Sequence, residues 1–353
     1  MNDEKQFILE MLKEGKITVE EANDLLNAIG NKKSRNENDF MAKINQSIES
    51  VIKKTTDAFE SISNIDLDNI DINQYNIKGQ VNTHKEMRID DEINAININI
   101  PSGKVLIERA NDSAITLNQD IWSKKSELND YINVEVNEDS LNISVNETYQ
   151  NIEATSIIRL ALGKNLYESL NINLVNGNIE IEDVDFSENT IDSVNAKINV
   201  INSQGNIDIQ NTNGKVDIKN THGDLVVDNV NGSVYLANIS GDRAEIDAVS
   251  GNIRVDGLDT KNLDADTHSG NIRIYNIKDA EKINLNTGFG NIVIDSESYN
   301  GNIKAEVLSQ GLNLSDKFKN KMQKEKGYEV STSLDNEDIE IFAAADFGRI
   351  NLR

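Results

Sequence analysis

The feature that most constrains the fold of this 353-residue chain is a short unit that begins with glycine and recurs along its second half. In GNIDIQNTNGKVDIKNTHGDLVVDNVNGSVYL, residues 205–236, a glycine and a polar residue precede two aliphatic residues that flank one variable position. The unit returns about every nine or ten residues, and a larger period of about 19 to 20 residues is typical of a solenoid. The units begin at Gly177, Gly205, Gly214, Gly223, Gly232, Gly251, Gly270, Gly290 and Gly301.

The two aliphatic positions of a unit lie two residues apart, so both side chains point to the same side of a strand. Each buried Ile or Val contributes roughly 1.5–3 kcal/mol, and stacked aliphatic columns can replace aromatic residues, which make up 5% of the chain. We predict a mainly β fold, a single-stranded β-solenoid with β-helix-like repeats, whose handedness and number of strands per coil are left open. The pattern predicts buried Ile207, Ile209, Ile253, Val255, Ile272 and Ile274, and exposed Asp208, Arg254 and Arg273.

Two further features concern the turns and the end of the solenoid. Glycine accepts a positive φ at a corner, and the asparagines that follow it could form amide ladders between coils. The segment LSDKFKNKMQKEKG, residues 314–327, is Lys-rich and predicts a helix beside the open end, where an uncapped strand edge would favour aggregation. The asparagines in question are Asn206, Asn252, Asn271, Asn291 and Asn302.

Residues 1–30 predict a helical hairpin. Gly15 can end the first helix, and Thr18 with Glu21 forms the capping box that opens the second. Two short helices cannot bury both of their apolar faces alone, so we expect the hairpin to pack on a partner, a second copy or the solenoid. The expected protein-interaction residues are Phe7, Met11, Leu25 and Leu26.

Residues 31–64 predict a polar linker and an amphipathic helix, and residues 65–353 predict the strand-repeat domain, most regular over 177–308. The polar face of the helix mixes Lys43 and Lys53 with Glu49 and Glu60, which favours packing on protein over a membrane surface. No apolar run approaches the roughly 20 residues of a membrane span, and the first residues do not resemble a secretory signal. We therefore expect a cytoplasmic location by default, with peripheral association with the envelope or cell surface left open.

The composition excludes several kinds of chemistry. The chain has no cysteine, which excludes thiolate catalysis and thiolate metal sites, and its formal net charge of -25 disfavours nucleic-acid binding. The charge serves solubility or attracts a cationic partner. His84, His222 and His268 are far apart in sequence, although a solenoid could bring the last two onto nearby coils. The sequence predicts no catalytic, cofactor-binding or metal-binding residue and no cofactor.

The segment ILEMLKEGKITVEEANDLLNAIG closely resembles the N-terminal module of YvlB/LiaX-like proteins of Gram-positive bacteria, with Gly15 to Thr18 and Glu20 to Ala22 as the matching core. The GNIxI units resemble the bacterial adhesin-like family of β-solenoids that follows this module. The resemblance implies a non-enzymatic role linked to cell-envelope stress, with the module implicated in sensing membrane-active antimicrobial peptides and the solenoid in restraining a signalling system. It carries over no catalytic residue.

We interpret the chain as a non-enzymatic binding or regulatory scaffold, linked to the envelope-stress or antimicrobial-peptide response. The expected partner is a protein or a cationic peptide, with self-association through the N-terminal helices as a further expectation, and neither nucleic acid nor an integral membrane segment is expected. The first alternative is a surface adhesin or structural protein. A carbohydrate-active β-helix enzyme ranks last, because it would need opposed carboxylates in a groove.

Overall fold

The computed structural model describes residues 81–110, 113–124, 128–149, 152, 154–163, 166–333 and 337–353. The predicted hairpin at 1–30 and the predicted helix within 31–64 lie outside these residues and stay predictions. The elements are β1 (Val81–Ile89), β2 (Ala95–Arg109), β3 (Ile115–Ser123), β4 (Ile132–Asn137), β5 (Ser140–Val145), the 3₁₀ turn η2 (Glu147–Tyr149), β6 (Ala154–Leu162), β7 (Leu166–Glu182), β8 (Asp185–Ile201), β9 (Asn206–Asn213), β10 (Val216–His222), β11 (Leu225–Asn231), β12 (Val234–Ser250), β13 (Ile253–Ser269), β14 (Ile272–Asp279), β15 (Lys282–Phe289), β16 (Ile292–Ile294), β17 (Ile303–Leu314), β18 (Asn320–Gln323), β19 (Tyr328–Ser331) and β20 (Ile339–Leu352).

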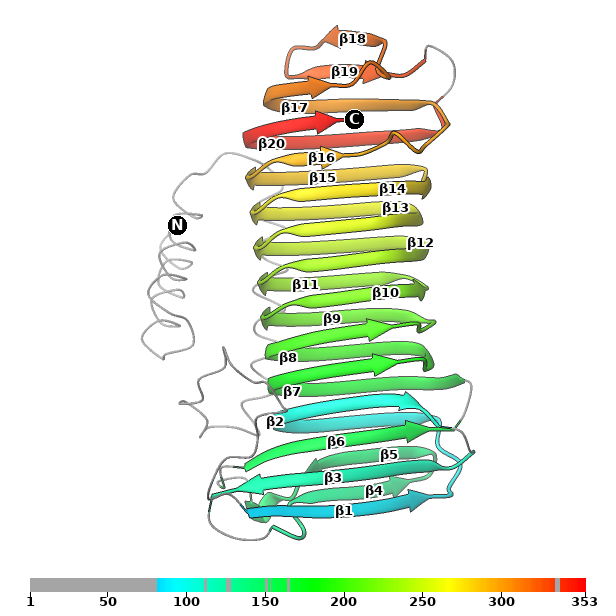
Figure 1. Cartoon of the computed structure of the whole chain (residues 1–353), viewed down its shortest axis with the longest axis vertical. Coiled ribbons are helices and arrows are strands. Elements are labelled where there is room, and N and C mark those ends of the chain that lie inside the picture. Colours follow the sequence, from blue (N-terminus) through cyan, green and yellow to red (C-terminus); the bar gives the residue numbers. More distant parts are fainter. Residues whose placement is uncertain are drawn as a thin grey trace.

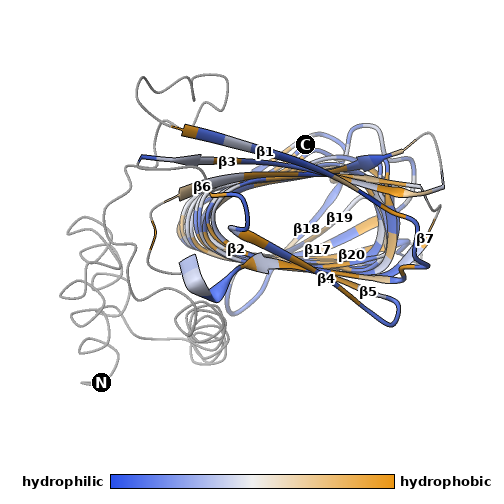
Figure 2. Cartoon of the chain, turned by 90° about the horizontal axis from the view of Figure 1, so that it is seen from below, coloured by the Kyte–Doolittle hydropathy of each residue, from blue (hydrophilic) through white to orange (hydrophobic). Residues whose placement is uncertain are grey.

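The predicted β-solenoid is confirmed, and it has two long sheets that face each other across a flattened core (Figures 1 and 2). Long strands such as β7, β12 and β13 bend at a corner and contribute to both sheets. Sheet 1 contains, in order, β5, 95–100 of β2, 166–174 of β7, 185–193 of β8, β9, β11, 244–250 of β12, 262–269 of β13, β15, 339–345 of β20 and 303–309 of β17. Sheet 2 contains β6, 103–109 of β2, 177–182 of β7, 196–201 of β8, β10, 234–240 of β12, 253–260 of β13, β14, β16, 350–352 of β20 and 311–314 of β17.

One coil therefore has two strands, and its length varies along the chain, with 19 residues between Asn176 and Asn195 on β7 and β8. Hydrogen bonds between equivalent side chains span 18 residues at Asn213 and Asn231, 19 at Asn252 and Asn271, and 20 at Asn271 and Asn291. The spacing of nine is half a coil, so the units at Gly205 and Gly214 lie in opposite sheets, in β9 and β10. The sequence pattern predicted that all units stack on one another in a single column. In the structure the units form two columns, one in each sheet.

The aliphatic pairs fill the core as predicted. Ile209, Val255 and Ile272 are fully buried, and Ile207 is 3% exposed. Arg254 is exposed, whereas Asp208 and Arg273 are half-buried between their neighbours on adjacent coils. Aromatic rings are rare inside; the largest fully buried side chains include Tyr131, Tyr167 and Phe186.

The recurring glycine has a steric cause at the corner that leads into sheet 2. A Cβ added to Gly251 would lie 1.9 Å from the carbonyl oxygen of Gly232 on the preceding coil, and one added to Gly270 would lie 1.8 Å from that of Gly251. Gly232 itself has a φ of 136°, which side chains disfavour. Backbones of successive coils thus pass within contact distance at this corner, which favours glycine, although Ala196 occupies the equivalent position between Gly177 and Gly214.

Amide ladders form, but they are not all where the sequence predicts them. Asn252, Asn271 and Asn291 hydrogen-bond in series along one corner, as expected. Asn206 lies at the other corner, where its amide donates to Glu188, so its place in that series was wrong. A second ladder joins residues with positive φ at the corner between sheet 2 and sheet 1: Asn202, Asn220 and Asn238.

Antiparallel strands cover both ends of the parallel stack (Figure 1). At the N-terminal end β3 pairs with β1 and β6, and β4 pairs with β5. At the C-terminal end β19 pairs with β17 and β18. The helix predicted for residues 314–327 was therefore wrong: the edge of β17 offers unpaired backbone groups, and a hairpin satisfies them where a helix could not.

The last strand enters the stack between two earlier ones. β20 pairs with β15 and β16 on one side and with β17 on the other, all in parallel. The chain leaves a gap of one coil after β16, forms β17 and the capping hairpin, and returns to fill the gap with β20 (Figure 1).

Candidate functional site

The three histidines do not form a catalytic or metal cluster. His84 contacts Asp120 between β1 and β3, at 2.9 Å. His222 lies where the chain passes from sheet 2 to sheet 1, and His268 lies at the opposite corner against Phe289. Across the described residues, no group of three potential metal-ligating side chains occurs. The structure therefore offers no centre on which His222 and His268 act together.

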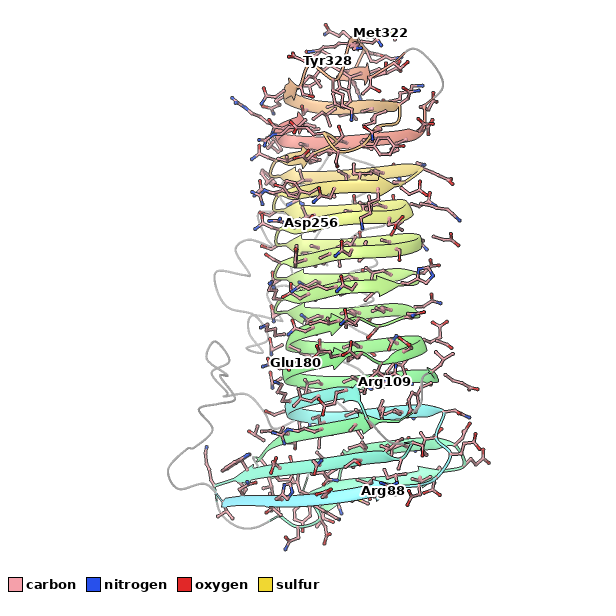
Figure 3. The ribbon with its side chains drawn as sticks, turned by 45° about the vertical axis from the view of Figure 1, so that its right-hand side comes forward. Arg88, Arg109, Glu180, Asp256, Met322 and Tyr328 are labelled. Carbon is pink, nitrogen blue, oxygen red and sulfur yellow. The ribbon has the colours of Figure 1, made fainter. Side chains whose placement is uncertain are left out.

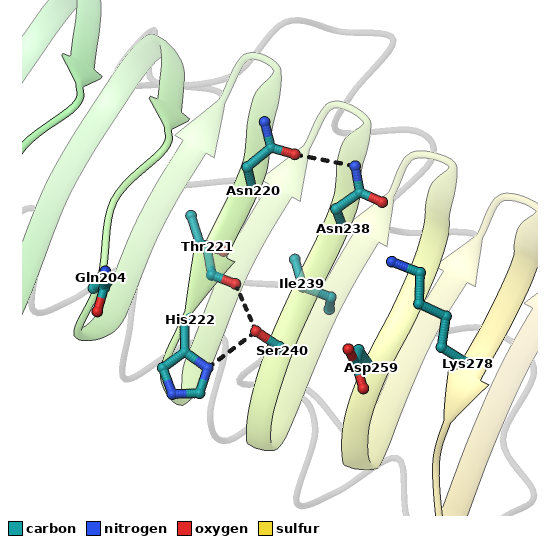
Figure 4. A pocket seen from close by; sticks show the side chains of 9 residues that line it. All are labelled: Gln204, Asn220, Thr221, His222, Asn238, Ile239, Ser240, Asp259 and Lys278. Atoms are coloured by element: carbon teal, nitrogen blue, oxygen red, sulfur yellow. Dashed lines mark hydrogen bonds between the residues drawn. The ribbon is translucent and has the colours of Figure 1, made fainter.

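A shallow polar groove runs across the coils at the corner from sheet 2 to sheet 1 (Figure 4). Its bottom includes buried Ile239 and Thr221, and Asn220 and Asn238 of the amide ladder line one side. The lining residues are Gln204, Asn220, Thr221, His222, Asn238, Ile239, Ser240, Asp259 and Lys278.

The groove contains a contact between a serine and a histidine. This contact links successive coils, as the asparagine ladder does, and the serine is not activated as a nucleophile. His222 Nδ1 lies 3.0 Å from Ser240 Oγ, but the serine hydroxyl donates to the carbonyl oxygen of Thr221, at 3.3 Å (Figure 4). A nucleophilic serine needs a base that takes its proton and a third group that orients the base. On the other side of His222 the same column holds Gln204, which is no carboxylate. The contact joins successive coils, as the asparagines do.

The outer surface of sheet 1 is acidic. Asp228, Asp247 and Asp266 are register neighbours on β11, β12 and β13, and Glu245 and Asp264 form a second column beside them. On the next coil asparagines replace the carboxylates and donate to them, so that the two columns end in amide–carboxylate hydrogen bonds of 2.6 Å.

The outer surface of sheet 2 has the opposite character over four consecutive coils. Lys215, Lys219, Tyr235, Arg254, Arg273 and Tyr275 lie there on β10, β12, β13 and β14 or directly before them, and we call them the cationic–tyrosine cluster. The Tyr235 ring has Lys219 Nζ at 5.5 Å, Lys215 Nζ at 5.9 Å and the Arg254 guanidinium at 5.6 Å from its centroid. The same guanidinium lies 4.8 Å from the Tyr275 ring. These distances are within the range of cation–π attraction.

Two of the four cations are paired with carboxylates. Lys215 binds Asp217 at 2.7 Å, and Arg254 binds Asp256 at 2.9 Å; Figure 3 shows Asp256 on this side of the solenoid. The hydrogen bond to Asp256 raises the pKa of Arg254, and hydrogen bonds from Asn276 and Arg254 hold the pKa of Asp256 below its ordinary value despite partial burial. Arg254 is thus a fixed cation, held between two rings.

The other two cations, Lys219 and Arg273, have no carboxylate within 4.0 Å among the residues that the structure describes. They lie at the two ends of the cluster, on β10 and β14, three coils apart. Neighbouring strands are about 4.8 Å apart, so the two charges are separated by roughly 14 Å along the solenoid axis. They are the charges of the cluster that a ligand can neutralise without displacing an internal ion pair.

The comparisons with known proteins fit this architecture. A family model described as Toastrack DUF4097 matches residues 93–353. The chain belongs to this family. A second model, described as a SHOCT-like domain, matches residues 3–34, which lie outside the described part of this DUF4097 protein. No curated protein matches the chain.

Solved structures similar to the DUF4097 protein include a "putative cell adhesion protein" from Clostridium sporogenes, with 13% identity, a TM-score of 0.24 and coverage of 77% of this chain and 99% of that one. A "putative adhesin" from Bacteroides fragilis has 14% identity, a TM-score of 0.36 and coverage of 77% and 97%. A "putative lipid binding protein" from Parabacteroides distasonis has 13% identity, a TM-score of 0.28 and coverage of 77% and 97%. These identities and scores are too low to transfer an activity to the DUF4097 protein.

The predicted interaction residues Phe7, Met11, Leu25 and Leu26 lie outside the described residues, and their role stays a prediction. The cationic–tyrosine cluster was not predicted from the sequence, because Arg254 and Arg273 were interpreted only as exposed residues at variable positions. The signal was present: once the coil length is known, the variable positions of successive units on one sheet become neighbours. In the described part of the DUF4097 chain, no helix has both the length and the apolar character that crossing a bilayer requires.

Proposed function

We propose that this DUF4097 protein is a non-enzymatic binding scaffold of the adhesin type, which holds an extended ligand along the outer surface of sheet 2. The observation that carries the proposal is the cationic–tyrosine cluster: four cations and two tyrosines gather on consecutive coils of a chain whose formal net charge is -25. Such a local reversal of charge marks a surface selected for contact with something anionic or electron-rich.

The architecture supports a scaffold. Successive coils repeat at about 4.8 Å, so the surface offers equivalent positions along one line, as an extended ligand requires. Antiparallel strands pair with both sheets at the N-terminal end and with sheet 1 at the C-terminal end, which protects these edges from adding further strands. The corner groove, which supplies hydrogen-bonding amides beside sheet 2, lacks an activated nucleophile among the residues described there.

The function is tested by presenting the pure protein with a panel of immobilised polymers and surfaces: acidic and neutral polysaccharides, duplex DNA, and anionic and neutral lipid vesicles. We expect saturable binding to at least one member and recovery of that member chemically unchanged. Absence of binding across the panel would contradict the scaffold, and new reducing ends or other products would show that the protein is an enzyme.

A second role, in the response to envelope stress, is proposed for the N-terminal module. It is supported by the resemblance of residues 1–30 to the YvlB/LiaX-like module, and the acidic columns of sheet 1 would attract a cationic amphipathic peptide to the same molecule. Deleting residues 1–30 is expected to leave the solenoid folded but to weaken binding of a labelled cationic amphipathic peptide. Equal affinity of both proteins for the peptide would remove the module from the mechanism. Association with the envelope or cell surface belongs to the same proposal.

A further inference from the structure

We infer that the cationic–tyrosine cluster binds an anionic polysaccharide laid along the solenoid axis; this inference rests on the proposed scaffold function and names its ligand. Three observations carry it: the two unpaired cations at the ends of the cluster, the tyrosine rings between them, and the spacing of the coils. Each has a counterpart in a chain of sugar rings that carry acidic groups.

The charge pattern selects a sparsely charged polymer. Lys219 and Arg273 have no carboxylate partner among the described residues, whereas Lys215 and Arg254 are partly neutralised by Asp217 and Asp256. The cluster therefore offers two charges without a carboxylate partner, roughly 14 Å apart along the axis. An acidic polysaccharide carries about one charge per one or two rings and can place its anionic groups on both cations at once.

The tyrosines select a ligand with flat, partly apolar faces. Tyr235 and Tyr275 are half-buried on the outer surface, and their orientation is supported by the neighbouring cations, with Arg254 between them. A tyrosine presents an apolar ring with a polar hydroxyl, which suits a sugar ring with its C–H face and its hydroxyl rim. Because coils repeat at about 4.8 Å, close to the length of one ring along an extended polysaccharide, successive rings can meet successive coils.

Two other anionic ligands fit less well. Duplex DNA carries one charge per about 1.7 Å of its axis, and its binding depends on neutralising many phosphates. The cluster has only four cations, two of them already paired, and the rest of the protein is strongly acidic. An anionic membrane attracts longer runs of Lys and Arg. Tighter binding to duplex DNA or to anionic vesicles is therefore one of the possible outcomes of the experiment.

The experiment titrates polygalacturonate, an α-linked polymer of sugar carboxylates, into the full-length protein by calorimetry. Its fully methyl-esterified form has the same backbone without the charges and is the matched ligand control. We expect binding of the acidic form that weakens with added salt, and binding of the ester roughly tenfold weaker, since two charge contacts are lost. Equal binding of the two forms would overturn the inference, because charge would not be recognised.

Variants locate the site. Lys219→Gln with Arg273→Gln removes two half-buried charges without breaking an ion pair, so the fold should be retained, and we expect roughly tenfold weaker binding. The matched control, Lys282→Gln with Lys319→Gln, removes two exposed charges from β15 and from the C-terminal cap and should leave binding unchanged. Equal effects of the two double variants would overturn the inference, because binding would then follow net charge rather than this cluster.

A second pair of variants tests the aromatic contribution to binding. Tyr235→Ala should weaken binding roughly tenfold, as loss of a central aromatic contact does. Tyr328→Ala removes a tyrosine that also contacts a lysine, Lys321 at 4.0 Å, but lies at the C-terminal end of the solenoid (Figure 3), and it should have no effect.

The same variants separate failure of the inference from failure of the scaffold. If DNA or anionic vesicles bind more tightly than polygalacturonate, and the Lys219/Arg273 variant weakens that binding, the polysaccharide is the wrong ligand and the scaffold stands. If no member of the panel binds, both proposals fail.

Discussion

Phe289 and Phe347 stack face to face between two neighbouring coils that are distant in sequence, with ring centroids 4.9 Å apart and planes 6° from parallel. Phe289 ends β15, and Phe347 lies at the equivalent corner of β20, the strand that fills the gap left after β16. Both rings are partly exposed, at 39% and 59%, where earlier coils have Ser269 or Asn231 at the same position. The stack therefore forms only when the last strand is in place.

The first prediction is that Phe347→Ala destabilises the protein by about 1 kcal/mol through loss of the aromatic pair. The measurement is the free energy of unfolding in denaturant. Met322→Ala is the control: Met322 is about as exposed, at 52%, but lies in the capping hairpin. The same cost at both positions would mean that the stack contributes nothing beyond ordinary burial.

The strand register was predictable from the sequence, but the path of the chain was not. Alternation with period two identifies Ile272 and Ile274 as core residues wherever the strand lies, because both point to one side. The assignment of units to two sheets depends on where the corners fall, and glycine marks a corner without saying which one. The insertion of β20 between β16 and β17 depends on pairing over long sequence distances, which no local pattern records.

The candidate site was only partly predictable for the same reason. Arg254 and Arg273 were identified as outward-facing, yet their neighbourhood exists only in the folded stack, where residues 19 apart become adjacent. Local patterns also failed at residues 314–327, because the unpaired edge of β17 decides the structure there rather than helical propensity.

The second prediction concerns close packing at the corner that leads into sheet 2. Gly251→Ala should destabilise by about 2–4 kcal/mol, because the added Cβ meets the carbonyl oxygen of Gly232 at 1.9 Å and the φ of 158° is unfavourable for alanine. Gly311→Ala is the control, since its Cβ would meet only the flexible side chain of Arg349, at 3.0 Å. Chemical denaturation compares the two, and equal stability would contradict the steric role of the repeated glycine.

The third prediction tests which side of the strand faces the core. Ile272→Asp places an unpaired carboxylate in the core and should cost at least about 3 kcal/mol. Val293→Asp makes the same kind of change on the outer surface of the next coil and should cost much less. Thermal melts of both variants decide the matter: an unchanged melting temperature for Ile272→Asp would show that the assigned register is wrong.

The fourth prediction concerns alkaline pH. Burial raises the pKa of Tyr131 to about 12, from an ordinary value of 10.0. The fold therefore favours the protonated phenol, and the resulting stability is complete below about pH 10 and is lost as the pH rises through about 12. The free energy of unfolding should fall over this interval, and Tyr131→Phe should remove about 2–3 kcal/mol of that fall.

The ring contact with Tyr149, at 6.1 Å between centroids, is kept in the variant. Denaturant titrations at pH 8, 10 and 12 measure the difference, with the pH 8 pair as the reference. An equally steep decline in both proteins would mean that other groups cause the alkaline unfolding.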